Sequence, residues 1–193
     1  TWVPAQRLYL YMAILPLLSA LLVWKLAPPD PVSGGPGGQK HSRERVSASA
    51  RWLRLRLLYF GFNFALVASF PYFIPWTQER TDSTAAMAGV LYSLPHAIYL
   101  IILISPLRRS VFFGNPWTLP AGLTLFALSY VIQATAGTMA AILAGRWIMG
   151  LGMTTCLFAL NAETARLTRI ENAGQSFGAL DSAGKWADRK SVV

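Results

Sequence analysis

Charged residues are scarce in this sequence of 193 amino acids. Asp, Glu, Lys and Arg together make up 13% of it, whereas a soluble globular domain usually carries about a quarter. Hydrophobic residues account for 54%, so too little polar surface is left to cover a globule that faces water. The composition therefore predicts an integral membrane protein.

Cysteine and histidine are also few. Cys156, the one cysteine, lies within an apolar run, which excludes an intrachain disulfide and a cysteine-based zinc site. The two histidines, His41 and His96, have no metal-ligand spacing. A nucleophile elbow, a phosphate loop and paired carboxylates inside an apolar run are all missing. We therefore expect no enzymatic activity, no metal and no cofactor.

The charges that are present are mostly basic, with 17 Lys and Arg against 8 Asp and Glu. A strongly basic chain suggests nucleic acid as a partner when its charges form a patch or line one helix face. Here the basic residues stand between apolar runs, as in the loops of a membrane protein. The lipid bilayer is the expected partner, and nucleic acid is not.

Five apolar runs are long enough to cross a bilayer, which takes about 20 helical residues. Backbone groups in lipid must be satisfied within the chain, so runs of this kind become helices. A sixth run opens near Ser176. We predict an all-α membrane bundle of five transmembrane helices plus a truncated sixth. The five runs are Leu8–Leu26, Leu57–Trp76, Thr84–Ile104, Thr118–Ala136 and Met139–Leu160.

The basic residues alternate from one connection to the next, and this alternation predicts the orientation. The side holding the connections after the first, third and fifth runs is the more basic one, so it is expected to face the cytoplasm. The other side has only Arg7 and Arg80. The protein is thus predicted to be a multi-pass protein of the inner (plasma) membrane. The basic residues of the cytoplasmic side are Lys25, Lys40, Arg43, Arg45, Arg51, Arg54, Arg56, Arg108, Arg109, Arg166 and Arg169.

Residues 27–50 are rich in Pro, Gly and Ser, which predicts a flexible, basic cytoplasmic linker without a core of its own. We place a boundary between half-domains there; an ordinary surface insertion is the alternative. The chain begins at Thr1 without Met, and residues 188–193, DRKSVV, resemble a translated sequencing adapter. The native sequence is therefore expected to be a fragment that ends near Ala187.

Arg146 is the charged residue placed deepest in an apolar run. It follows Met139 by seven residues, or about 10 Å of helical rise. A charge near the bilayer centre costs about 2.5–3.5 kcal/mol on insertion scales, so it normally faces a cavity or a partner. Gly150 and Thr154 share its helix face. Arg146 is either a substrate, proton or gating contact, or an arginine tied to helix ends or reaching for the interface.

His96 lies in the middle of the third run, one turn after Tyr92 and beside Pro95. A histidine there could relay a proton, or it could be a satisfied histidine of the bundle. Pro95 is expected to kink or break its helix. Trp52, Trp76 and Trp117 are interpreted as anchors at the membrane interface.

Two further groups of charges lie near the cytoplasmic ends of the runs. Asp181 and Lys185 are spaced i, i+4 in the sixth run and could pair on one helix face, with transport or proton coupling as a possible role. Glu163 precedes Arg166 and Arg169. It is either part of a cytoplasmic salt-bridge latch or a residue of a solvated helix end.

Three segments resemble the major facilitator superfamily of secondary transporters. Residues 145–152, GRWIMGLG, are similar to that family's R-x-x-x-G-x-G helix motif, in which Gly145, Gly150 and Gly152 would pack against other helices. Residues 105–115, with Arg108 and Arg109, are similar to its basic loop. Residues 176–186 are similar to the glycine-spaced start of a half's fifth helix.

The resemblance implies two six-helix halves that are joined by a long cytoplasmic loop and hold a small-molecule substrate between them. Residues 1–26 would be the helix that closes a preceding half, and residues 51–187 most of the C-terminal half; an N-terminal half that begins near Arg51 is the alternative. The missing remainder of the chain would be its partner. Arg108, Arg109 and Glu163 would close the cytoplasmic gate.

The implied function is alternating-access transport of a small molecule, coupled to protons, with Arg146, His96, Asp181 and Lys185 as pathway candidates. A transporter-like sensor module of a multidomain signalling protein is the alternative function.

Overall fold

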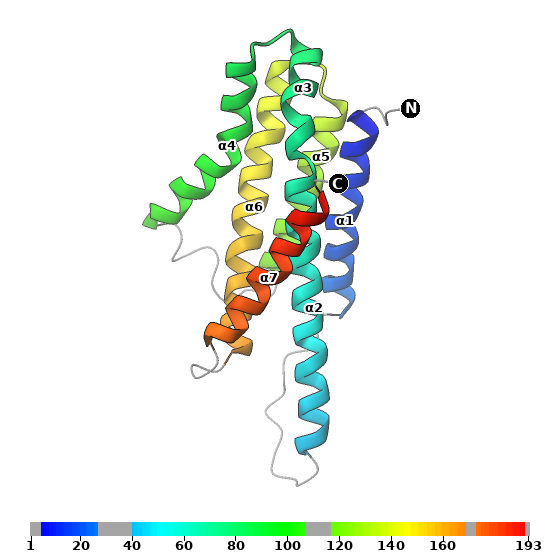
Figure 1. The fold of residues 1–193 in the computed structure, drawn as a ribbon, viewed down its shortest axis with the longest axis vertical. Helices are drawn as coiled ribbons and strands as arrows, with labels where there is room; N and C mark the ends of the chain where they lie inside the picture. The colour runs from blue at the N-terminus through cyan, green and yellow to red at the C-terminus, as the bar shows by residue number, and fades with distance from the viewer. Residues whose placement is uncertain (1–4, 27–39, 107–116, 169–172, 192–193) are drawn as a thin grey trace.

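The computed structural model describes residues 5–26, 40–106, 117–168 and 173–191, and the regular elements in these ranges are α-helices. Helix α3 continues in the direction of α2, and the other successive helices run in opposite directions, most of them roughly side by side (Figure 1). They are α1 (Ala5–Leu26), α2 (Lys40–Ala68), α3 (Phe70–Thr81), α4 (Ala85–Ile104), α5 (Thr118–Thr135), α6 (Met139–Leu167) and α7 (Ala173–Ser191).

Four helical stretches are long and apolar enough to cross a membrane: Arg51–Thr81, which joins α2 and α3, and the helices α4, α5 and α6. A shorter apolar stretch, Arg7–Val23, lies in α1. The polar helix α7 is not among the described helices that are long and apolar enough to cross a membrane. The predicted all-helical architecture with helices of spanning length is confirmed, whereas the count of five spans and a truncated sixth stays a prediction.

The starts of two spans lie where threonine caps occur in the sequence. Thr84 precedes α4 in an extended conformation, and its side chain accepts a hydrogen bond from the Met87 N–H. Thr138 does the same for α6 with the Ala141 N–H. Each cap satisfies one of the N–H groups that a helix leaves unpaired at its start. The predicted starts of these two helices are therefore confirmed, whereas α6 continues to Leu167, beyond the predicted end at Leu160.

The predicted linker is too long. Helix α2 begins at Lys40, so residues 40–50 are helical and only residues 27–39 lie outside the described structure. The physical reason is local composition: the last glycine of the Pro/Gly-rich stretch is Gly38, and neither Pro nor Gly occurs in residues 39–50. Without those residues nothing interrupts helix formation, and Arg and Ala favour it.

The second predicted span is interrupted. Helix α2 ends at Ala68 and α3 begins at Phe70, with Pro71 in the first turn of α3. Proline has no N–H to donate to the carbonyl four residues earlier and disfavours helical geometry in the residue before it. Beside the break, the Ser69 hydroxyl donates to the Leu66 carbonyl at 3.0 Å.

Tyr130 of α5 contacts α2 and Ser69, next to the junction between α2 and α3. Its buried hydroxyl donates to the Ala65 carbonyl and lies 3.4 Å from the Ser69 hydroxyl. We expect Tyr130→Phe to lower the free energy of unfolding in detergent by about 1 kcal/mol, because it removes one buried hydrogen bond. Tyr11→Phe is the control, since Tyr11 is exposed and should change nothing. An equal effect of both substitutions would contradict a role for Tyr130 at the break.

Helix α6 is central in the bundle. It contacts α5 and α4, while α1 lies against α5 and α7 against α2. In Figure 1, α6 starts near the α3–α4 connection and runs to the end of the molecule where α1 finishes and α2 starts. The alternation of chain direction that underlies the predicted orientation is thus present in the fold.

Candidate functional site

The Arg146 side chain is buried between α6 and α4 with 1% of its surface exposed. Its Nε donates a hydrogen bond to the Leu91 carbonyl at 3.0 Å, and Nη2 donates to the Tyr92 carbonyl. Nη1 lies 3.1 Å from the Met149 sulfur. The guanidinium thus binds two consecutive backbone carbonyls of a neighbouring helix.

Pro95 explains why one of these carbonyls is free to accept. In a regular helix the Leu91 carbonyl would accept from the N–H of residue 95, but proline has none. A carbonyl left unpaired in an apolar interior is costly, so another donor normally replaces the missing one. Arg146 supplies that donor across the α4–α6 contact.

Gly150, one turn after Arg146, allows α6 to approach α4 closely. A Cβ atom at this position would lie 3.1 Å from the Pro95 Cα and 2.9 Å from the Ile98 Cβ. The absence of a side chain therefore brings the base of Arg146 within reach of the α4 carbonyls. Arg146 and Gly150 share a helix face, as predicted, and that face is turned toward the proline of α4.

Aromatic rings complete the surroundings of the guanidinium. Its Cζ lies 4.2 Å from the centre of the Phe73 ring and 5.6 Å from that of Tyr92. Cations are attracted to the faces of such rings, and more strongly where water is excluded. Phe73 belongs to α3, so the arginine touches α3 as well as α4. We call Phe73, Tyr92, Pro95, Arg146 and Met149 the arginine site.

A second buried group lies next to the arginine site. It consists of Tyr9, Trp76, Tyr130 and Gln133, and we call it the Tyr9 group. The rings of Tyr9 and Trp76 are 4.9 Å apart and those of Tyr9 and Tyr130 are 6.2 Å apart, between centroids. Gln133 donates to the Ser129 carbonyl at 3.0 Å and approaches the Met149 sulfur at 3.7 Å.

The prediction for Trp76 is wrong. It was interpreted as an interface anchor, but its side chain is 3% exposed and packs against Tyr9 and Phe73. The other buried members of the group were not predicted either, because a tyrosine or glutamine in an apolar run has no spacing that marks it. Pro95 was the one usable signal, since a proline frees the carbonyl four residues before it.

His96 lies beside the arginine site without a direct contact to Arg146 among the described interactions. Its ring is half-buried, 6.1 Å from Phe70 and 6.3 Å from Tyr92 between centroids. Tyr92 is therefore the shared neighbour of the two predicted pathway residues. The structure brings His96 and Arg146 to the same part of α4 and α6.

Asp181 and Lys185 lie elsewhere, on α7, which packs against α2. Their charged atoms form an ion pair at 2.7 Å, and both side chains are exposed. The hydrogen bond and charge of Asp181 raise the pKa of Lys185, so the lysine stays protonated over a wider pH range. Gly184, next to Lys185, lies near Tyr59 and Asn63 of α2. The predicted i, i+4 pairing is present, but it is not part of the arginine site.

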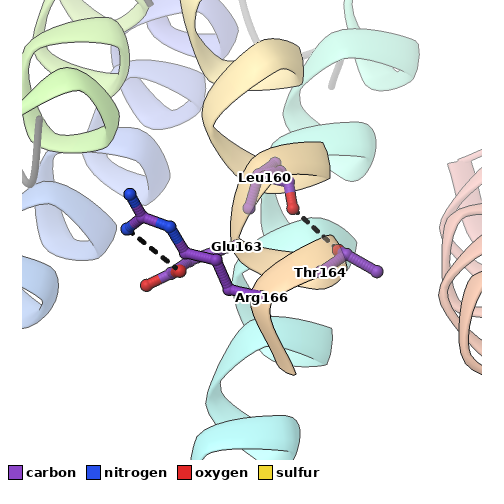
Figure 2. A network of polar contacts seen from close by, with 4 residues as sticks. All are labelled: Leu160, Glu163, Thr164 and Arg166. Carbon is purple, nitrogen blue, oxygen red and sulfur yellow. Dashed lines mark hydrogen bonds and ion pairs between the residues drawn. The ribbon is translucent and has the colours of Figure 1, made fainter. Parts of the chain in front are cut away.

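Glu163 lies on the surface of α6 near its C-terminal end. Its carboxylate lies 3.8 Å from the Arg166 guanidinium, and Thr164 donates to the Leu160 carbonyl at 2.7 Å. Figure 2 marks both contacts with dashed lines. Glu163 and Arg166 are both exposed and belong to one helix. This ion pair therefore joins no second helix. The other gate candidates, Arg108 and Arg109, lie outside the described residues.

Gly145 and Gly152 lie on the side of α6 that contacts α5. A Cβ on Gly145 would be 2.9 Å from the Gln133 Cγ, and one on Gly152 would be 2.6 Å from the Phe126 backbone nitrogen. A Cβ on Gly122 of α5 would likewise lie 2.9 Å from the Cys156 backbone nitrogen. Close helix contacts through small residues are typical of membrane bundles.

Within the described residues no three His, Cys, Asp or Glu side chains are grouped so that they could hold a metal ion. No family model, curated protein or solved structure matches the chain.

Proposed function

We propose that the chain is part of a multi-pass secondary transporter of the plasma membrane, in which Arg146 contributes to the path of a small-molecule substrate. Residues 1–26 would close one half, and residues 51–187 would form most of the other, with five spans and a truncated sixth. Proton coupling and alternating access between two halves belong to the same proposal. The observation that carries it is the buried guanidinium at two carbonyls of helix α4, which contains Pro95.

Support comes from the coincidence of a charge with helix interruptions. Transporters of several folds build their binding sites from discontinuous helices, whose unwound carbonyls and helix ends meet near the middle of the bilayer. Here Arg146 touches α3, which begins just after one break, and α4, which contains Pro95. A charged side chain inside a membrane is costly and therefore usually functional.

Arg146 can both contact a substrate and tie two helices together, so its two interpretations are compatible. In the arrangement described, the guanidinium is occupied by carbonyls, so it holds α4 and α6 together. A substrate that competes for the guanidinium would release the α4 carbonyls and loosen that contact. Movement of α4 relative to α6 would then be linked to binding, as alternating access requires.

The test is a flux assay on the complete protein in proteoliposomes, with a panel of solutes and a pH-sensitive dye inside. We expect Arg146→Ala to reduce the flux at least about tenfold, the effect of losing roughly 1.4 kcal/mol of interaction. The amount of inserted protein should stay the same. Arg166→Ala is the matched control, because Arg166 is on the same helix but exposed.

Unchanged flux in Arg146→Ala would remove this residue from the pathway. A complete protein that moves no solute of the panel and carries a cytoplasmic signalling domain would replace the transporter proposal with that of a membrane sensor.

A further inference from the structure

The arginine site carries a positive charge that nothing described around it neutralises. Arg146 is the one ionised side chain among the buried polar and charged residues of the described structure; the others are neutral Ser, Thr and Gln. Its hydrogen-bond partners are two carbonyls and a thioether sulfur. These dipoles lower the energy of the guanidinium without cancelling its charge, and burial makes an uncancelled charge costly.

Polar atoms without a described partner lie in the group next to it. The Tyr9 hydroxyl and the Trp76 Nε1 have no hydrogen-bond partner in the described structure, although these side chains are 1% and 3% exposed. Both can donate a hydrogen bond. The Gln133 Oε1, a buried acceptor, also has no hydrogen-bond partner in the described structure. Buried polar atoms in proteins are normally paired, so three from one neighbourhood call for an explanation.

We infer that the arginine site and the Tyr9 group together bind the anionic oxygens of a small molecule, a carboxylate or a phosphate group. An anion would neutralise the Arg146 charge and accept hydrogen bonds from Tyr9 and Trp76. Gln133 would accept from a hydroxyl of the ligand or from a water bound to it. This inference rests on the proposed transport function, for which it names the substrate class.

The aromatic contacts connect these donors in space. Phe73 lies under the guanidinium at 4.2 Å and is 6.2 Å from Trp76 between ring centroids, and Trp76 packs against Tyr9. The donors thus come from α1, α3 and α6. Their near-complete burial means that the arrangement described is closed. Separation of the first turns of α1 from α3 would expose Tyr9 and Trp76 together.

The test is the thermal unfolding of the complete protein in detergent at fixed ionic strength, with sodium acetate or sodium phosphate as the probe. Tetraethylammonium chloride serves as the cationic comparison. We expect the Tm to rise with acetate or phosphate, since a ligand bound only by the folded state stabilises it. Arg146→Gln should abolish this rise, and tetraethylammonium should produce none.

Tyr9→Phe distinguishes a ligand contact from a structural one. Removing a buried hydroxyl without a partner should leave the Tm unchanged or higher in the absence of the anion. The same substitution should weaken the anion affinity by about tenfold, the effect of one hydrogen bond to a charged group. Tyr11→Phe, two residues further on and exposed, should retain full affinity.

Three outcomes would overturn the inference: no stabilisation by either anion, equal affinity in Tyr9→Phe and wild type, or a lower Tm of Tyr9→Phe without anion. Flux that depends on Arg146 but carries cations or neutral solutes would overturn it while keeping the transporter. Anion binding without any flux would keep the site and overturn the transporter.

Discussion

Replacing Pro95 with alanine should remove about half of the destabilisation that Arg146→Ala causes. On its own, Arg146→Ala leaves the Leu91 carbonyl without a donor, and the Tyr92 carbonyl loses its side-chain partner. We expect a loss of about 2 kcal/mol in the free energy of unfolding, less than the sum for two hydrogen bonds because a buried charge also disappears. Alanine at position 95 restores the N–H that the Leu91 carbonyl would accept in a regular helix.

The measurement is a double-mutant cycle on the complete protein, unfolded by denaturant in detergent micelles. The interaction energy between positions 95 and 146 should be about 1 kcal/mol, well above the 0.3–0.5 kcal/mol or so within which independent sites add. Arg166→Ala in both backgrounds is the control, because its exposed guanidinium pairs with Glu163 of its own helix. Additive effects of Pro95→Ala and Arg146→Ala would show that the arginine does not act through the proline break.

Alanine at position 152 should be among the most disruptive small substitutions in the bundle. Its Cβ would lie 2.6 Å from the Phe126 backbone nitrogen, 3.0 Å from the Phe126 Cα and 3.1 Å from the Gly122 carbonyl oxygen. All three are backbone atoms, so no side-chain rotation relieves the contact. The α5–α6 contact must separate locally, and we expect a loss of about 2–3 kcal/mol, the upper part of the range for overpacking.

Gly89→Ala is the matched control for this substitution. Gly89 is also helical, but a Cβ there meets nothing within 4 Å. Removing glycine from a helix is favourable by up to about 1 kcal/mol in water, so this variant should be neutral or slightly more stable. The same unfolding measurement serves both variants. Equal stabilities of Gly152→Ala and Gly89→Ala would mean that α5 and α6 are not in close contact.

The sequence by itself determined where the apolar helices lie and where two of them begin. Thr84 and Thr138 each precede a long apolar run, and a hydroxyl at that position caps the first turn through contacts within four residues. It also placed a charge inside one apolar run, at Arg146, and a proline inside another, at Pro95. These features depend on the order of neighbouring residues and need no knowledge of the fold.

Interruptions of helices were harder to predict than their starts. Pro95 was expected to kink or break α4, and the proline does free the carbonyl that Arg146 binds. Pro71 has the same chemistry, but its effect on the second run was not predicted, and the linker was extended over residues that are helical in α2. A proline in the first turn of a helix costs no hydrogen bond, whereas one in its interior removes one, so its effect depends on where the helix begins.

The contacts of the arginine site were decided by tertiary structure alone. Arg146 and Leu91 are 55 positions apart, and no local spacing relates them. The burial of Tyr9 and Trp76 could not be read either, since α1 and α3 present apolar residues on more than one side. In a bilayer the lipid-facing and the protein-facing sides of a helix are both apolar, so the periodicity that identifies the buried face of a soluble helix is weak. The packing of α1, α3, α4 and α6 therefore determines which polar groups meet, and that packing follows from side-chain volumes and close glycine contacts across the whole bundle.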